Sequence, residues 1–136
     1  MISSWSGAPL RARAIALTAA AVLGYGTVVH LAHLVTCGLE PSPDVPDVLA
    51  GYFVLLTLLD PTAAVLLVLR RRSGIVLGCV VFVTDALANG YANYVLDHTH
   101  GITAGRIGQG IVTMLAVTLI ASSAGLWSLC PSRLPP

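Results

Sequence analysis

Charged side chains are scarce in this chain. Only 10% of its 136 residues are charged, whereas 56% are hydrophobic. Lysine is absent, so all seven basic residues are arginines, and they balance six acids to a net charge of +1. This balance provides no basic surface for nucleic acid, and a soluble domain of this length could not bury so much apolar surface. The composition therefore predicts an integral membrane protein, with the lipid bilayer as its first partner.

Motifs for catalysis and redox chemistry are also missing. The cysteines Cys37, Cys79 and Cys130 have no CxxC or paired spacing, which argues against a zinc ribbon or a thiol oxidoreductase. There is no GxSxG, no HExxH and no phosphate-binding loop, and no nucleophile stands beside an obvious base. We therefore expect a protein that is not an enzyme, with acid–base chemistry on a lipid as the weaker alternative.

Long apolar runs dominate what is present. Each run is close to the roughly 20 residues that a helix needs to cross a bilayer. Short segments rich in proline, glycine and charge separate the runs, so successive helices should be antiparallel neighbours. The sequence predicts an all-α integral membrane protein, a single membrane domain over residues 1–136 built as a four-transmembrane-helix antiparallel bundle. The expected spans are residues 14–34, 48–69, 74–95 and 107–129.

The arginines predict how this bundle is oriented. Arg11 and Arg13 precede the first run, residues 70–72 fill the second connection, and Arg133 follows the fourth run. Basic residues collect on the cytoplasmic side of membrane proteins, so both termini are expected in the cytoplasm and the chain in the cell membrane as a multi-pass protein. Arg106, in the third connection, is the one exception.

A cleaved signal peptide is an alternative reading of the first run. Arginines precede an alanine-rich segment, and LVTC at 34–37 looks like a lipoprotein cleavage box. However, the apolar run is longer than the 7–15 residues of a signal core, and it contains His30 and His33. A membrane span is therefore the favoured interpretation.

Polar residues gather at one depth of the predicted bundle. Asp85, Asn89 and Asn93 are four residues apart, so on a helix they form one stripe of roughly 80°. Helical rise places Asp60 and Asp85 near the midplane, with His30 level with Asn89. A carboxylate at the bilayer centre costs about 2.5–3.5 kcal/mol and normally faces protein or a water-filled cavity. We therefore expect these five residues to form an inward-facing ligand or ion site that opens to the outer side.

Two functions are compatible with such a site. Two acids at one depth in a dry bundle cannot both ionise easily, so they could bind or pass a proton, a cation or a small polar ligand, as in a transporter. Alternatively, the polar groups only hold helices together, and the protein is an accessory or structural subunit of a larger membrane complex. Pairs of small residues four apart, such as Ala88 and Ala92, favour a homo-oligomer or a membrane-protein partner.

The histidines suggest a metal cofactor as a weaker hypothesis. Imidazole binds zinc or copper, and a thiolate or carboxylate, such as Cys37 or Asp97, could complete the set of ligands. HxxH and HxH are weak patterns, and nothing in the spacing requires the two pairs to meet. The candidate ligands are His30, His33, His98 and His100.

Overall fold

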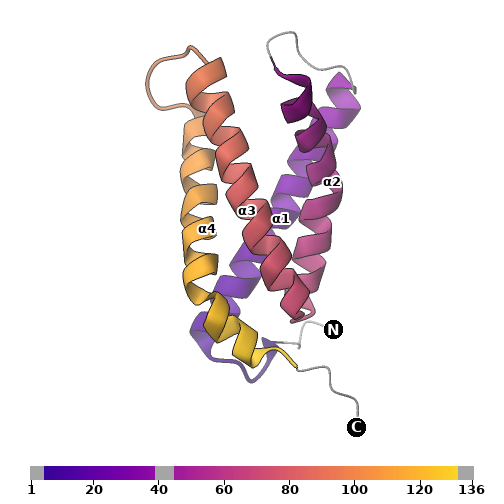
Figure 1. Ribbon diagram of the computed structural model, residues 1–136, viewed down its shortest axis with the longest axis vertical. Helices are drawn as coiled ribbons and strands as arrows, with labels where there is room; N and C mark the ends of the chain where they lie inside the picture. The colour runs from indigo at the N-terminus through magenta and orange to yellow at the C-terminus, as the bar shows by residue number, and fades with distance from the viewer. Residues whose placement is uncertain (1–4, 39–44, 132–136) are drawn as a thin grey trace.

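The computed structural model describes residues 5–38 and 45–131. Four helices are each long and apolar enough to cross a membrane, which confirms the prediction of an all-helical chain with four such segments. A π-helical segment, η2 (Ala92–Leu96), continues α3 toward the third connection. The described residues are otherwise helices and short connections (Figure 1). The helices are α1 (Leu10–Cys37), α2 (Asp47–Val68), α3 (Arg72–Tyr91) and α4 (Ala104–Leu129).

All four helices start earlier than the apolar runs suggested, and the difference is largest for α1 and α4. α1 begins directly after Pro9, because proline fixes its own backbone for the helix start and arginine is a good helix former. Arg11 and Arg13 are therefore part of the helix. α4 begins at Ala104 because the Thr103 hydroxyl accepts a hydrogen bond from the Arg106 amide at 3.2 Å, a side-chain cap. Arg133 lies outside the described residues.

One end of the bundle is closed by Trp5 and arginines. Trp5 is 1% exposed, and its indole Nε1 donates to the Leu67 carbonyl at 2.8 Å. The Arg70 guanidinium lies 5.3 Å from the centre of the Trp5 ring, and the left-handed backbone of Arg70 (φ 56°) turns the chain sharply from α2 into α3. We call this end, which carries residues 5, 70–72 and 130, the arginine end. The opposite end, with residues 97–103, is the loop end.

α2 and α3 approach each other closely near the arginine end. A Cβ atom on Gly74 would lie 2.5 Å from the backbone carbon of Leu66 and 2.6 Å from the nitrogen of Leu67. Only glycine fits at such a backbone contact. Around it lies the apolar core, whose fully buried side chains include Leu56, Ala63, Leu67, Ile75, Val81, Phe82 and Leu119.

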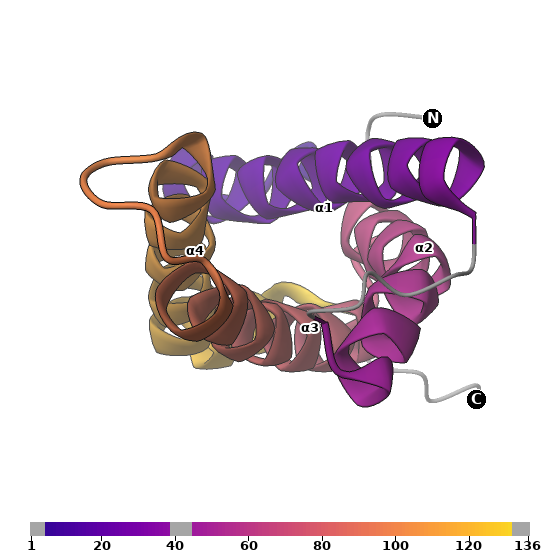
Figure 2. The ribbon, with the colours of Figure 1, turned by 90° about the horizontal axis from the view of Figure 1, so that it is seen from above.

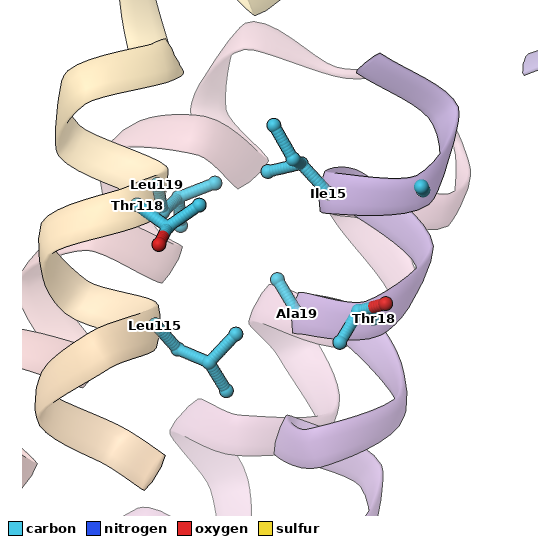
Figure 3. Close-up of a pocket in the computed structure, with 7 residues that line it drawn as sticks. Ile15, Thr18, Ala19, Leu115, Thr118 and Leu119 are labelled. Atoms are coloured by element: carbon cyan, nitrogen blue, oxygen red, sulfur yellow. The ribbon is translucent and has the colours of Figure 1, made fainter. Parts of the chain in front are cut away.

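α1 crosses the bundle obliquely. It lies beside α4 near the arginine end and beside α2 at the loop end (Figures 1 and 2). Between α1 and α4 is a cavity of about 190 Å³, into which Ile15, Leu115 and Leu119 project (Figure 3). Its lining is almost entirely carbon, so the polar residues of the bundle gather elsewhere.

Candidate functional site

Asp60 lies where α2 crosses α1. At 4% exposure it is the one charged side chain that is buried among the described residues. Its Oδ2 is 3.8 Å from Nε2 of His30 on α1. A Cβ atom on Gly26 would lie 2.6 Å from the same oxygen. The missing side chain at Gly26 therefore makes room for the Asp60 carboxylate against the α1 backbone.

The His30 ring is held by an aromatic neighbour on α2. It stacks on Phe53, with ring centroids 5.8 Å apart and planes 20° apart. Phe53 and Asp60 are seven residues apart, so they share one face of α2. Only 17% of the His30 side chain is exposed. The histidine is thus positioned by α2 at two points, the aromatic ring and the carboxylate.

Asp85 brings a second carboxyl group from α3. Asn89 donates its Nδ2 to Asp85 Oδ1 at 2.6 Å. Asp85 is close enough to Asp60 for the two carboxyl groups to interact electrostatically. Both carboxyl groups also interact electrostatically with the Tyr52 hydroxyl. We call His30, Asp60 and Asp85 the acid cluster. It joins three helices, and with every group ionised it carries one negative charge in excess.

The polar stripe of α3 turns away from the acid cluster toward α4. Asn93 donates to the Asn89 carbonyl at 2.9 Å and to the Gly105 carbonyl at 3.4 Å. One turn further along α4, Gln109 donates its Nε2 to the Ala86 carbonyl at 2.6 Å. Each four-residue step rotates by about 40°, so Asn93 faces α4 although Asp85 faces the cluster. Asn93 therefore links α3 to α4.

Arg106 is a residue of the loop end that the sequence marked only as an exception to the orientation pattern. Its guanidinium donates to the carbonyls of Thr99 (2.7 Å), Gly101 and Asn93 (3.3 Å), and it lies 5.2 Å from the Tyr94 ring centre. The Asn93 carbonyl lies within the π-helical segment, and those of Thr99 and Gly101 follow it. Backbone acceptors at such a helix end lack helical partners. The available signal was a lone arginine that breaks the orientation pattern. It holds the loop end together.

We predict that Arg106→Gln loosens residues 97–103. Charge-assisted hydrogen bonds contribute about 1.5–3 kcal/mol each, so losing them lowers the local opening free energy by a similar amount. Hydrogen exchange of the connection in lipid nanodiscs should become faster by at least tenfold, since each 1.4 kcal/mol corresponds to about tenfold. Arg13→Gln, at an exposed arginine of α1, is the matched control. Equal exchange in both variants would show that Arg106 does not hold the connection.

Asp97 places a fixed negative charge beside this arginine. The Thr99 amide and hydroxyl donate to its carboxylate at 2.9 and 2.8 Å. These hydrogen bonds, with smaller contributions from Arg106 and His98, lower the pKa of Asp97 below its ordinary value. The carboxylate is therefore ionised at neutral pH. It gives the loop end an acid that lies outside the acid cluster.

The structure does not bring the histidine pairs together. His33 is exposed on α1, and His98 and His100 are exposed in the connection between α3 and α4. Seen from above, that connection and the last turn of α1 lie on opposite sides of the bundle (Figure 2). Within residues 5–38 and 45–131, no three His, Cys, Asp or Glu side chains are arranged to hold a metal ion. The Cys37 side chain lies outside what the structure describes.

The acid cluster is therefore the candidate functional site. It combines a buried carboxyl group, a second carboxyl group and an imidazole, supplied by α2, α3 and α1. Comparison of the chain with protein-family models, with curated proteins and with solved structures finds no match.

Proposed function

We propose that this membrane protein binds one proton or one small cation at the acid cluster. The cation is held by the excess negative charge and not by direct ligation from all three side chains, since these are not arranged as a ligand set for a metal ion. The observation that carries the proposal is the burial of Asp60 against His30 with Asp85 within electrostatic range. A separation of 3.8 Å is longer than a hydrogen bond, so the contact does little to offset the cost of burying a charge. At this distance the Asp60 carboxyl group contributes little to holding α1 and α2 together. It is well suited to exchange a proton for a cation.

The charges of the cluster suggest the stoichiometry. With all three groups ionised, the two carboxylates exceed the imidazolium by one negative charge, which one proton or one monovalent cation neutralises. Such neutralisation removes most of the penalty for a charge in the membrane interior. We therefore infer that cation and proton compete for the same place. Binding of one should displace the other.

The ligand is proposed to enter from the loop end. Toward that end, Asn89 lies about one turn beyond Asp85 on α3 and Tyr52 about two turns from Asp60 on α2, so both provide polar neighbours. Toward the arginine end, the cluster is followed by fully buried apolar side chains, among them Ala63, Leu67, Ile75 and Phe82. Water and ions do not cross such a packed core without rearrangement. The proposed activity is accordingly binding, and passage through the bundle would need α1 to move.

Cation-induced proton release tests this proposal. Protein in lipid nanodiscs, in weakly buffered solution, receives lithium, sodium, potassium, magnesium or calcium chloride, and the released protons are counted with a pH indicator. Wild type should release a measurable quantity of protons, up to one per chain, with at least one of these cations. Asp60→Asn and Asp85→Asn should release none, because each removes a carboxyl group from the cluster. Asp97→Asn, at an acid outside the cluster, should behave as wild type.

Several outcomes would overturn the proposal. Absence of release and of cation binding by wild type at every pH is one, and unchanged release by Asp60→Asn is another. If Asp60→Asn instead abolishes the association with a co-purifying membrane protein while release is absent throughout, the accessory-subunit function replaces it. Vesicles loaded with a pH indicator then distinguish binding from transport. A proton flux that is lost in Asp60→Asn would show that the ion crosses the bundle.

A further inference from the structure

The arginine end carries a cavity that the acid cluster does not involve. It has a volume of about 590 Å³ and is lined by Leu69, Arg71, Arg72, Ser73 and Pro131. Arg71 is exposed, while Arg72 is partly buried with its guanidinium 5.1 Å from the centre of the Trp127 ring. Contact with the indole fixes the direction of that guanidinium. One arginine is thus held in place while the other can close over a ligand.

The charge around this cavity is positive. Its lining includes two arginines and a serine hydroxyl but no acidic residue among those that the structure describes. Arg70 and Arg72 are both close enough to Cys130, next to Pro131, to interact with it electrostatically. Guanidinium groups bind phosphate oxygens through paired hydrogen bonds, which is why arginine is preferred at phosphate sites. The chemistry of the lining therefore fits a phosphate group.

An apolar groove adjoins the cavity on the outer faces of α3 and α4. It has a volume of about 450 Å³, and its lining includes Val76, Val80, Ile120 and Trp127. Val76 and Val80 are each 52% exposed, so the groove faces outward from the bundle. A lining residue of each hollow packs against the other, since the guanidinium of Arg72, which lines the cavity, lies over the ring of Trp127, which lines the groove.

We propose that the arginine end binds an anionic phospholipid. Its phosphate lies between Arg71, Arg72 and Ser73, and one acyl chain runs along the groove between α3 and α4. A molecule with a negative head and an apolar tail matches a cationic cavity joined to an apolar groove at the edge of a membrane span. Free phosphate would fill only the cavity, and a zwitterionic lipid would gain less from the arginines. This site is independent of the acid cluster.

Quenching of Trp127 fluorescence by brominated lipids tests the proposal. The chain has two tryptophans, of which Trp5 is 1% and Trp127 41% exposed. Comparison of the full chain with Trp127→Phe therefore isolates the signal of Trp127. Vesicles of phosphatidylcholine contain an equal mole fraction of either brominated phosphatidylglycerol or brominated phosphatidylcholine. The anionic probe should quench Trp127 at about one-fifth or less of the mole fraction that the zwitterionic probe needs, the preference expected from even one arginine at the membrane surface.

Matched arginine variants test which residues cause the preference for the anionic probe. The pair Arg71→Gln with Arg72→Gln should lose the preference for the anionic probe, whereas Arg11→Gln with Arg13→Gln, which removes the same charge from exposed positions of α1, should keep it. Arg71→Lys with Arg72→Lys retains charge but not the paired hydrogen bonds and should keep only part of it. Native mass spectrometry of wild type from the same vesicles should show one bound phosphatidylglycerol.

Three results would overturn the assignment. Equal quenching of wild type by the two probes would show that the site does not select an anionic head. Equal loss in both arginine pairs would show an unspecific charge effect of the whole arginine end. Binding of inorganic phosphate by a wild type that shows no preference for the anionic probe would show that the cavity binds free phosphate and not a lipid.

Discussion

Gly26→Ala is expected to weaken cation-induced proton release by about tenfold or more, although it changes no ionisable group. The new Cβ atom would lie 2.6 Å from Asp60 Oδ2, so the carboxylate must leave its place beside His30. Overpacking of this kind costs about 1–3 kcal/mol, and each 1.4 kcal/mol is about tenfold in affinity. The measurement is the cation concentration at half-maximal proton release in nanodiscs.

Gly24→Ala is the matched control for this substitution. It lies two residues earlier on α1, and a Cβ atom there would meet no atom within 4 Å. Replacing a helical glycine by alanine in open space stabilises a helix by up to about 1 kcal/mol. Gly24→Ala should therefore bind cations as wild type does and unfold at a slightly higher temperature. Equal cation affinity in the two variants would mean that Asp60 does not depend on its place against α1.

Gly74→Ala is expected to cause the largest loss of stability. Its Cβ atom would lie 2.5–2.6 Å from backbone atoms of Leu66 and Leu67, which cannot rotate away as a side chain can. α2 and α3 must separate, and the free energy of unfolding should fall by about 3 kcal/mol, the upper end of overpacking costs. Unfolding in a graded mixture of mild and denaturing detergents, followed by circular dichroism, measures the loss.

Two other glycines provide comparisons for the loss of stability in Gly74→Ala. A Cβ atom on Gly125 of α4 would meet no atom within 4 Å, so Gly125→Ala should not lower stability. At Gly78 the nearest atoms are side-chain carbons of Leu119 and Leu67 at 3.2 and 3.3 Å. These side chains can shift, so Gly78→Ala should fall between the other two. A loss for Gly74→Ala no greater than that for Gly78→Ala would contradict the close backbone contact between α2 and α3.

The four spans could be predicted from the sequence because their signal is local. Twenty or so consecutive apolar residues predict a membrane helix wherever the neighbouring helices lie. The ends were harder, because Pro9 and the Thr103 cap act through single residues at the helix starts. The π-helical turn at 92–96 had no signal in the sequence.

The candidate site could be predicted only in outline. Depth along a helix follows from residue number, so Asp60, Asp85 and His30 could be placed at similar levels. Which neighbour each side chain faces depends on how the helices rotate and cross, and the sequence does not determine that. Asn93 consequently faces α4, and the role of Gly26 emerged only from the crossing of α1 and α2. Arg106 was visible as an exception, but its carbonyl partners were not.

The proposed function requires that His30, Asp60 and Asp85 form one site. Solid-state ¹⁵N NMR of histidine-labelled protein in lipid bilayers tests it most directly, with the His30 signal assigned by its loss in His30→Gln. On titration with acid, the His30 ring signals should differ from those of wild type in Asp60→Asn and in Asp85→Asn, because each substitution removes a carboxyl group of the acid cluster, and Asp97→Asn should match wild type. Identical titration of His30 in wild type, Asp60→Asn and Asp85→Asn would contradict the account.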